Sequence, residues 1–385
     1  MIFNVVNCGD RVHFVQLSHA DGMNTYLFDK DTYDRLYRCD YMSQEDWAKY
    51  AVSKPVIGVV FILLGLVYMV TYIPCLIIMR RQSFYKNSCF KIMFFMGLLD
   101  ICCLFLNCFE TGFFLIIGSV YCIYPNFQYI TGSLAVGGWS CQCMFCVVLA
   151  FNRCTDFWSQ RWSEALFDRA KTYIWIALPF LYFLFYIFFT PVATFTSAMN
   201  MWFFDPYVTM PEDLVPVDHG FYISLGWAHS INDYVVISCL LILYAALIVS
   251  VRVTSRGGNH AKTQLKILLQ AGIICLLNFI PALVFTVAKF FQPPPIFIFM
   301  CVISYQLGNG GAGLVLLILN KTIRTNVKQL LLRNKVVFHV FTKSIKSESH
   351  FQSATAENAG KDPQNSKDST YSPKIRTLRT KGAQL

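Results

Sequence analysis

One acidic residue lies in the middle of a long apolar stretch. Asp100 is flanked on both sides by hydrophobic runs. A carboxylate at the centre of a membrane-spanning helix costs about 2.5–3.5 kcal/mol, so it should face neighbouring helices and find polar partners there. Gln142 and Asn309, in later apolar runs, are the candidate partners. This polar site inside the bundle is either functional or a neutral, hydrogen-bonded group that holds helices together, and the sequence leaves both readings open.

The cysteines and histidines predict no metal site. Most of the fifteen cysteines lie in apolar runs, which is typical of small buried hydrophobic residues. Cys141, Cys143 and Cys146 are spaced like metal ligands, but no histidine lies near them. Membrane oxidases and desaturases bind iron through clustered histidines, whereas the seven histidines here are dispersed. We therefore expect no metal, no cofactor and no enzyme activity.

Composition indicates a membrane protein. Of the 385 residues, 55% are hydrophobic and only 14% are charged, against roughly a quarter charged in soluble domains. A soluble chain would interrupt its apolar runs with charges every few residues, and this chain does not. The lipid bilayer is the expected solvent of its surface, and no nucleic-acid partner is expected.

Seven apolar stretches are long enough to cross a bilayer as helices. A helix rises about 1.5 Å per residue and needs roughly 20 apolar residues to span the hydrocarbon core. The seven stretches cover approximately residues 55–79, 90–117, 129–149, 173–195, 234–251, 267–290 and 296–319. The fifth is the shortest, and Leu225 is an alternative start for it. The predicted fold is an all-α membrane protein, a bundle of seven transmembrane helices.

The distribution of lysine and arginine predicts the orientation. The connections after the first, third, fifth and seventh stretches are rich in these residues, whereas residues 119–128 and 196–221 contain neither. Positive loops stay in the cytoplasm. We therefore expect a multi-pass protein of the plasma membrane, with residues 1–54 as an extracellular N-terminal segment and the C-terminus in the cytoplasm.

The chain after the seventh stretch divides into two parts. Residues 321–335 place apolar side chains on one helical face and basic ones on another, which predicts an eighth helix lying in the membrane interface. The bundle and this helix would occupy residues 55–335. Residues 336–385 are rich in serine, threonine and lysine, which predicts a disordered cytoplasmic tail open to phosphorylation and, once phosphorylated, to arrestin.

Five features in order resemble the rhodopsin-like G-protein-coupled receptors. They are Asp100 in the second stretch, Arg153 closing the third, Trp175 in the fourth, Phe279-x-Pro281 in the sixth, and Asn320-Lys321-x-x-Arg324 after the seventh. The resemblance implies coupling to a heterotrimeric G protein through Arg153. Because proline interrupts the helical hydrogen bonds, Phe279 and Pro281 are expected to form a helix pivot.

A closer resemblance covers nearly the whole seven-helix region. The chain is similar to the nematode serpentine chemoreceptors of class T in these segments: Tyr72-Ile73-Pro74-Cys75-Leu76, residues 88–93, Gly118 with Tyr121-Cys122-x-Tyr124-Pro125, Leu149-Ala150-Phe151-Asn152-Arg153-Cys154, Thr172-Tyr173-x-Trp175, and Trp202-Phe203-Phe204-Asp205-Pro206-Tyr207. The resemblance implies a chemosensory receptor that binds an extracellular small molecule.

The chain departs from the rhodopsin-like pattern at three places. Asn152 replaces the acid that usually precedes the arginine, so the clamp on Arg153 is expected to be weaker. The Asn-Pro-x-x-Tyr block of the seventh helix is replaced by residues 312–316, Ala-Gly-Leu-Val-Leu. Cys122 lies where such receptors anchor a disulfide to the second outer loop, which lacks cysteine here. Cys8 and Cys39 are the remaining outer cysteines; we predict a Cys39–Cys122 bridge, with a free Cys122 as the alternative.

The ligand site is expected among the outer ends of helices three, five, six and seven. By span position alone, Tyr129, Phe279, Tyr305 and Gln306 are the candidates for its lining. The seventh stretch lacks the lysine that an opsin needs, and the third lacks the acid expected of an amine receptor. A neutral, anionic or apolar ligand is therefore favoured. A seven-helix channel or transporter is the alternative, but only Asp100 supplies a mid-membrane charge.

Overall fold

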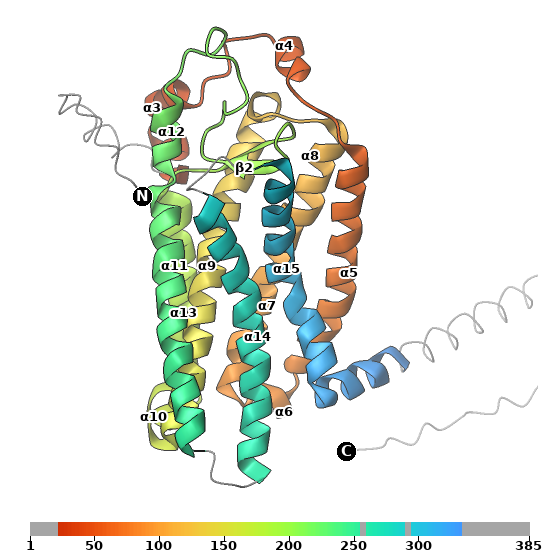
Figure 1. Ribbon diagram of the computed structural model, residues 1–385, viewed down its shortest axis with the longest axis vertical. Helices are drawn as coiled ribbons and strands as arrows, with labels where there is room; N and C mark the ends of the chain where they lie inside the picture. Colours follow the sequence, from red (N-terminus) through yellow and green to blue (C-terminus); the bar gives the residue numbers. More distant parts are fainter. Residues whose placement is uncertain (1–21, 255–258, 289–293, 333–385) are drawn as a thin grey trace, which may run out of the picture. The chain divides into compact units, whose positions relative to one another are not determined.

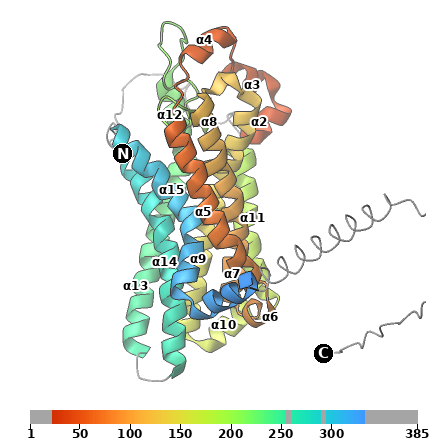
Figure 2. The same ribbon diagram turned by 90° about the vertical axis from the view of Figure 1, so that its right-hand side faces the viewer.

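The computed structural model describes residues 22–254, 259–288 and 294–332 of the chain. Residues up to Lys328 belong to one unit, a helical bundle. Its seven long helical stretches are apolar enough to cross a membrane, as predicted. They are α5 (Pro55–Met79), α7–η1–α8 (Ser88–Leu104, Phe105–Glu110, Thr111–Ile117), α9 (Pro125–Trp158), α11 (Lys171–Phe189), α12–α13 (His219–Leu225, Trp227–Thr254), α14 (Asn259–Ala288) and α15 (Pro295–Leu319). Figures 1 and 2 show them side by side along the bundle.

Proline and glycine set several helix limits. Pro55, Pro125 and Pro295 occupy the first turn of α5, α9 and α15, where the missing N–H costs nothing. Gly118 follows α8 with a φ of 70°, a conformation that a side chain would strain. These residues fix where three spans begin and where the second ends.

The fourth span ends earlier than expected, and the fifth begins near the earlier of its two expected starts. α11 ends at Phe189 rather than at residue 195, because Thr190 precedes Pro191 and is extended. The chain then forms a hairpin of β1 (Thr194–Thr196) and β2 (Met201–Phe203), in which Phe195 pairs with Trp202. α13 begins at Trp227, close to the alternative start at Leu225 rather than at residue 234, and so includes two polar residues, His229 and Asp233.

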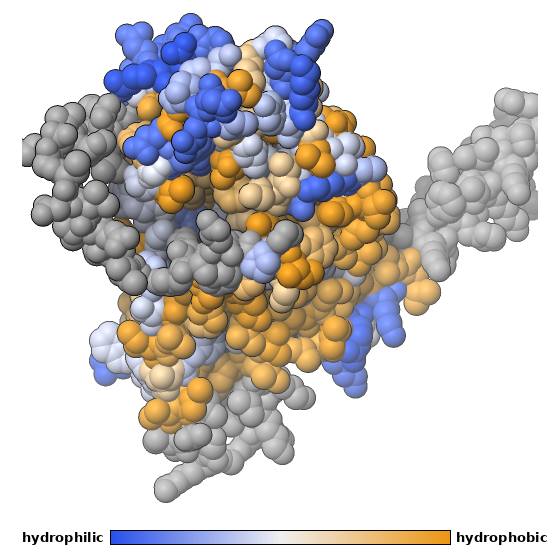
Figure 3. Space-filling view, turned by 45° about the horizontal axis from the view of Figure 1, so that its top comes forward, coloured by the Kyte–Doolittle hydropathy of each residue, from blue (hydrophilic) through white to orange (hydrophobic). Residues whose placement is uncertain are grey.

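The helix α9 is the central element of the bundle. Its apolar part is the most buried of the seven spans, and it packs against α7, α11, α13 and α14. By contrast, α5, α11 and α13 expose leucine, isoleucine, valine and phenylalanine along their outward faces. Figure 3 shows these hydrophobic residues around the middle of the bundle and hydrophilic residues at one end.

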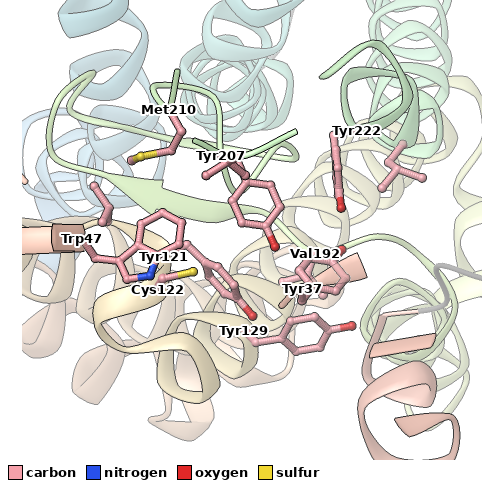
Figure 4. Packing of buried hydrophobic residues seen from close by; sticks show 12 residues of the cluster. Tyr37, Trp47, Tyr121, Cys122, Tyr129, Val192, Tyr207, Met210 and Tyr222 are labelled. Atoms are coloured by element: carbon pink, nitrogen blue, oxygen red, sulfur yellow. The ribbon is translucent and has the colours of Figure 1, made fainter. Parts of the chain in front are cut away.

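The hydrophilic end carries a folded cap, which we call the cap end. The cap consists of α2 (Gly22–Phe28), α3 (Lys30–Leu36), α4 (Gln44–Lys49), the turn η2 (Tyr121–Ile123), the β1–β2 hairpin and α12. Figure 4 shows its core, in which Tyr37, Trp47, Tyr121, Tyr207 and Tyr222 are buried together. Tyr37 and Trp47 belong to the N-terminal segment, and burial of such large aromatic side chains stabilises the packing of this segment on the bundle.

The opposite, basal end carries short connecting helices. They are α6 (Gln82–Tyr85) and α10 (Gln160–Phe167). Residues 321–332, in the predicted eighth helix, are helical, and Ile323 and Val327 bury their side chains. Cys8 and the tail from residue 336 lie outside the described residues.

Candidate functional site

At the basal end of α9, Arg153 lies in a fully buried polar network. Its side chain has no exposed surface, and its Nη2 lies 2.5 Å from Oδ2 of Asp156. The same nitrogen donates a hydrogen bond of 2.5 Å to Oδ1 of Asn152. A buried guanidinium is stable only when paired, so these two acceptors hold the side chain in place.

Asn152 and Asp156 tie this arginine to two other elements. The Nδ2 of Asn152 donates to Oγ of Ser88, at the start of α7. Ser163, on α10, donates through its hydroxyl to the second oxygen of Asp156. Arg153 is therefore connected to the second span and to the loop helix that follows the third. Its Nε and Nη1 are buried without a hydrogen-bond partner among the described residues, which leaves donors for a further acceptor.

Arg153 has a charged partner, Asp156, that the sequence reasoning did not consider. The asparagine at position 152 supplies only a neutral acceptor, as expected, but Asp156 supplies a charged one from one helical turn further along. Residues three apart face each other on a helix. The expectation of a weakened clamp considered only the adjacent residue, and so it overlooked Asp156.

Asp100 is buried between α5, α7 and α9. Its two carboxylate oxygens each accept a hydrogen bond of 2.7 Å, from the hydroxyl of Tyr72 and from Nε2 of Gln142. The contact with Gln142 joins two residues that the sequence had paired, and Tyr72 is a partner that it had not. Asn309, the other expected partner, instead donates to the backbone oxygen of Tyr305 in its own helix.

A second buried acid lies nearer the cap end. Asp233 of α13 accepts hydrogen bonds from the indole nitrogen of Trp139 on α9, at 2.9 Å, and from Nδ2 of Asn232, at 3.3 Å. Its other oxygen lies 3.2 Å from Nδ1 of His229. Four helices meet here, because Phe285 of α14 and Tyr305 of α15 pack against the Trp139 ring. We call Trp139, His229, Asp233, Phe285 and Tyr305 the aromatic–acid cluster.

The four residues expected to line a ligand site lie in different places. Tyr129 belongs to the cap core and donates to the backbone oxygen of Gly22. Gln306 is buried and donates to the backbone oxygen of Asn107 in the π-helical segment η1. Phe279 lines an apolar cavity between α13 and α14. Of the four, only Tyr305 belongs to the aromatic–acid cluster, since position along a span does not specify which way a helix faces.

The expected pivot lies within α14. Pro281 is inside this helix and cannot donate a hydrogen bond to the backbone oxygen of Leu277. Gly308 of α15 packs beside that oxygen: a Cβ added to the glycine would lie 3.3 Å from it. The seventh span therefore approaches the sixth closely where the helical ladder is interrupted, and Phe279 lies on the same turn.

Cys39 and Cys122 are joined by a disulfide. Hydrogen bonds surround it: Trp47 Nε1 donates to the backbone oxygen of Cys39, and Gln44 Nε2 to that of Cys122, each at 3.0 Å. Tyr207, after the β1–β2 hairpin, donates to the backbone oxygen of Arg38 at 2.7 Å. The N-terminal segment is thus attached both to the start of the third span and to the loop between spans four and five.

Three important residues escaped sequence reasoning, although signals for two of them were present. Asp156 follows Arg153 by one helical turn, and Tyr72 begins one of the family segments. Asp233 immediately precedes residue 234 and lies inside the fifth span only with the alternative start at Leu225. Within the described residues, no group of three or more histidine, cysteine or acidic side chains could hold a metal ion.

Two comparisons with known proteins indicate one family, and a third indicates the fold. The family model described as "Serpentine type 7TM GPCR chemoreceptor Srt" matches residues 23–339. Serpentine receptor class T-55 of Caenorhabditis elegans is 26% identical over 300 residues, which cover 77% of this chain and 80% of that protein. Squid rhodopsin shares the fold, with a TM-score of 0.55 at 11% identity over 75% of this chain and 89% of that structure. The chain is therefore a multi-pass membrane protein with a G-protein-coupled receptor fold, and it belongs to the Srt family of serpentine chemoreceptors.

Proposed function

We propose that the protein binds an extracellular small molecule at the aromatic–acid cluster and activates a heterotrimeric G protein through Arg153. The observation that supports this most is that α9 carries both sites. Trp139 and Arg153 lie on the same continuous helix, roughly 21 Å apart at about 1.5 Å per residue. A displacement at one site can therefore be transmitted to the other through a single rigid element.

The cluster is suited to an uncharged ligand with apolar or aromatic surface. One oxygen of Asp233 already accepts from an indole and an amide, and the other lies 3.2 Å from the imidazole of His229, so protein groups surround this carboxylate. Rings of Trp139, Phe285 and Tyr305 supply apolar surface from three helices. Sites for small molecules combine such surface with few polar groups. A cationic amine would have to displace His229 to reach the acid.

The site lies where the sixth and seventh helices could respond to a ligand. Phe285 is one turn beyond Pro281, whose missing hydrogen bond makes α14 easier to bend. A ligand that contacts Phe285 and Tyr305 more favourably in one arrangement of α14 and α15 would increase the population of that arrangement. At the basal end, the same movement would alter access to Nε and Nη1 of Arg153, which have no hydrogen-bond partner in the described part of the chain.

In this proposal the cap end faces the outside of the cell and the basal end faces the cytoplasm. The distribution of lysine and arginine along the sequence supports this orientation in the plasma membrane. The phosphorylatable tail from residue 336 would then be available to arrestin. A tag after Leu385 should be detected only in permeabilised cells, and the opposite result would reverse the orientation.

The function can be tested with a second-messenger assay in cells that express the chain, screened with a panel of volatile and pheromone-like compounds. We expect a response that Trp139→Leu and Arg153→Ala each abolish without reducing surface expression. Arg161→Ala, which removes an exposed arginine of α10, is the matched control and should respond normally. Signalling that persists in both Trp139→Leu and Arg153→Ala would contradict the proposal. A ligand-gated current that persists without G protein would favour the channel alternative.

A further inference from the structure

A large apolar cavity lies between α13 and α14, away from the aromatic–acid cluster. Its volume is about 710 Å³. The walls are aliphatic residues of both helices with one tyrosine, one phenylalanine and one cysteine: Leu240, Leu241, Tyr244, Ala245, Leu247, Ile248, Leu268, Leu269, Gly272, Ile273, Cys275, Leu276 and Phe279. The hollow is open on one side rather than enclosed, so an occupant can enter it from outside the bundle.

Two small residues keep the cavity open. Ala245 of α13 and Gly272 of α14 contribute to opposite walls. A Cβ added to Gly272 would find its nearest neighbour, a ring carbon of Tyr244, at 3.5 Å, which is ordinary contact distance. The hydroxyl of Tyr244 donates to the backbone oxygen of Ala271 and so has a partner already. The cavity therefore offers volume and apolar surface but little capacity for hydrogen bonding.

The position of the cavity determines what can fill it. Its lining lies within two segments that are apolar enough to cross a membrane, His219–Val249 and Leu268–Val287. Leu240, Leu247 and Leu268 form a buried floor, whereas Leu241, Ile248, Leu269 and Leu276 are more than half exposed at the rim. In a bilayer such a rim faces hydrocarbon. Water would find almost no polar partner inside, and so an apolar chain is the favoured occupant.

We propose that this cavity is a binding site for an acyl chain of a bilayer phospholipid, which enters from the membrane between α13 and α14. The chain fills the space beside Gly272 and packs on the floor formed by Leu240 and Leu247. Both lipid tails and the cavity wall are apolar, so the preference for the site comes from van der Waals packing rather than from a hydrophobic driving force. This site is independent of the small-molecule site proposed above.

The test uses the full-length receptor in phosphatidylcholine nanodiscs that contain a small fraction of phosphatidylcholine with a photoreactive diazirine in the middle of one acyl chain. Cross-linked residues are identified by peptide mass spectrometry. We expect cavity residues such as Leu241, Leu269 and Leu276 to be labelled about threefold more often than equally exposed residues of α5, because a held chain stays near them longer. Leu63 and Val67, 54% and 53% exposed, are the reference positions.

Matched variants test occupancy directly. Gly272→Phe fills the cavity and should reduce its labelling to the level of α5, while Gly272→Ala should retain the labelling. Unchanged labelling of Leu63 and Val67 and an unchanged thermal unfolding temperature confirm that the fold is intact. If Gly272→Phe does not fold, Ala245→Phe fills the space from the other wall. Equal labelling of the cavity and α5 in the wild type, or labelling that survives a folded phenylalanine variant, would overturn the proposal without affecting the proposed receptor function.

Discussion

Arg153 and Asp156 form a buried ion pair in which Nη2 and Oδ2 are 2.5 Å apart. The arginine side chain is fully buried and that of the aspartate is 14% exposed. The pair lies one turn from the end of α9, at the point where Ser163 of α10 also contacts the aspartate. An acid placed after the arginine thus makes the contact that the resemblance leads one to expect from an acid placed before it.

Replacing this acid should release the arginine. Asp156→Asn keeps a hydrogen-bond acceptor but removes its charge, and hydrogen bonds to charged groups exceed neutral ones by about 1 kcal/mol. If the pair is specific to the resting state, basal G-protein activation should rise about fivefold. Nucleotide exchange on purified G protein measures it, with Asp168→Asn in the exposed loop as the control. Lowered basal activity would show that the pair belongs to the active state.

Asn152→Asp tests the same network from the other side. The new carboxylate would add a second charged acceptor for Arg153, but it would lose the donor that Asn152 gives to Ser88. Because Asp156 already compensates the arginine, we expect only a small decrease in basal signalling in the wild-type background. In the Asp156→Asn background the decrease should be larger, since the new acid is then the only adjacent charge. Equal effects in the two backgrounds would mean that the two positions act independently.

The disulfide should be needed for a stable cap. Cys39→Ser opens a covalent link between positions separated by 83 residues. In soluble proteins a lost disulfide typically costs about 2–4 kcal/mol, so a clearly lower unfolding temperature and lower surface expression are expected. Cys122→Ser and the double variant should match Cys39→Ser, while Cys102→Ser removes an exposed free thiol and should behave as wild type. Peptide mapping that finds Cys122 alkylated without reduction would show that the bridge does not form.

The buried acid at position 100 should tolerate an amide but not an apolar side chain. In Asp100→Asn, the new oxygen can accept from Tyr72, and the new amide can donate to Oε1 of Gln142, which has no partner among the described residues. Asp100→Leu leaves two buried donors unsatisfied, at about 1–3 kcal/mol each. Thermal unfolding of the purified receptor should therefore rank wild type and Asp100→Asn well above Asp100→Leu. Equal stability of the two variants would show that the hydrogen bonds of Asp100 do not stabilise the receptor.

Apolar length predicted the bundle because it reports directly on the membrane. The seven spans follow from it, whereas the receptor fold was implied by the family resemblance. A charge within an apolar run also predicted that Asp100 would be buried with polar partners, and Gln142 is one of them. Hydropathy counts His229 and Asp233 as two polar residues and so favoured the later start of the fifth span, but the two side chains lie 3.2 Å apart across one helical turn and the helix begins near the alternative start, Leu225. The residues expected to line one ligand site lie in different parts of the protein, because position along the sequence does not determine which side of a helix faces the interior. Tyr129, for example, packs into the cap rather than into the bundle core.

The pH dependence of the cap should depend on Asp205. Its Oδ2 lies 2.6 Å from Nδ1 of His219, and its Oδ1 accepts from the backbone nitrogen of Tyr207. Burial raises the pKa of this carboxyl above its ordinary value, and the contacts with His219 and Tyr207 only partly oppose the shift. A raised pKa in the folded state means that folding favours the protonated acid. The stabilisation is present below the ordinary aspartate pKa, about 3.9, and is lost as the pH rises through the higher folded-state value.

Asp205→Asn should therefore remove this pH dependence and leave the receptor at least as stable as the wild type at neutral pH. The asparagine oxygen can still accept from Tyr207, but it carries no charge that burial would penalise. Thermal unfolding measured between about pH 4 and pH 8 checks this. Asp40→Asn is the contrasting variant: Asp40 is exposed, and its hydrogen bond with Arg38 lowers the pKa of its carboxyl, so its contribution should change with pH in the opposite direction. If Asp205→Asn destabilises the receptor at every pH, the contact between Asp205 and His219 stabilises the cap by more than burial of the carboxylate destabilises it.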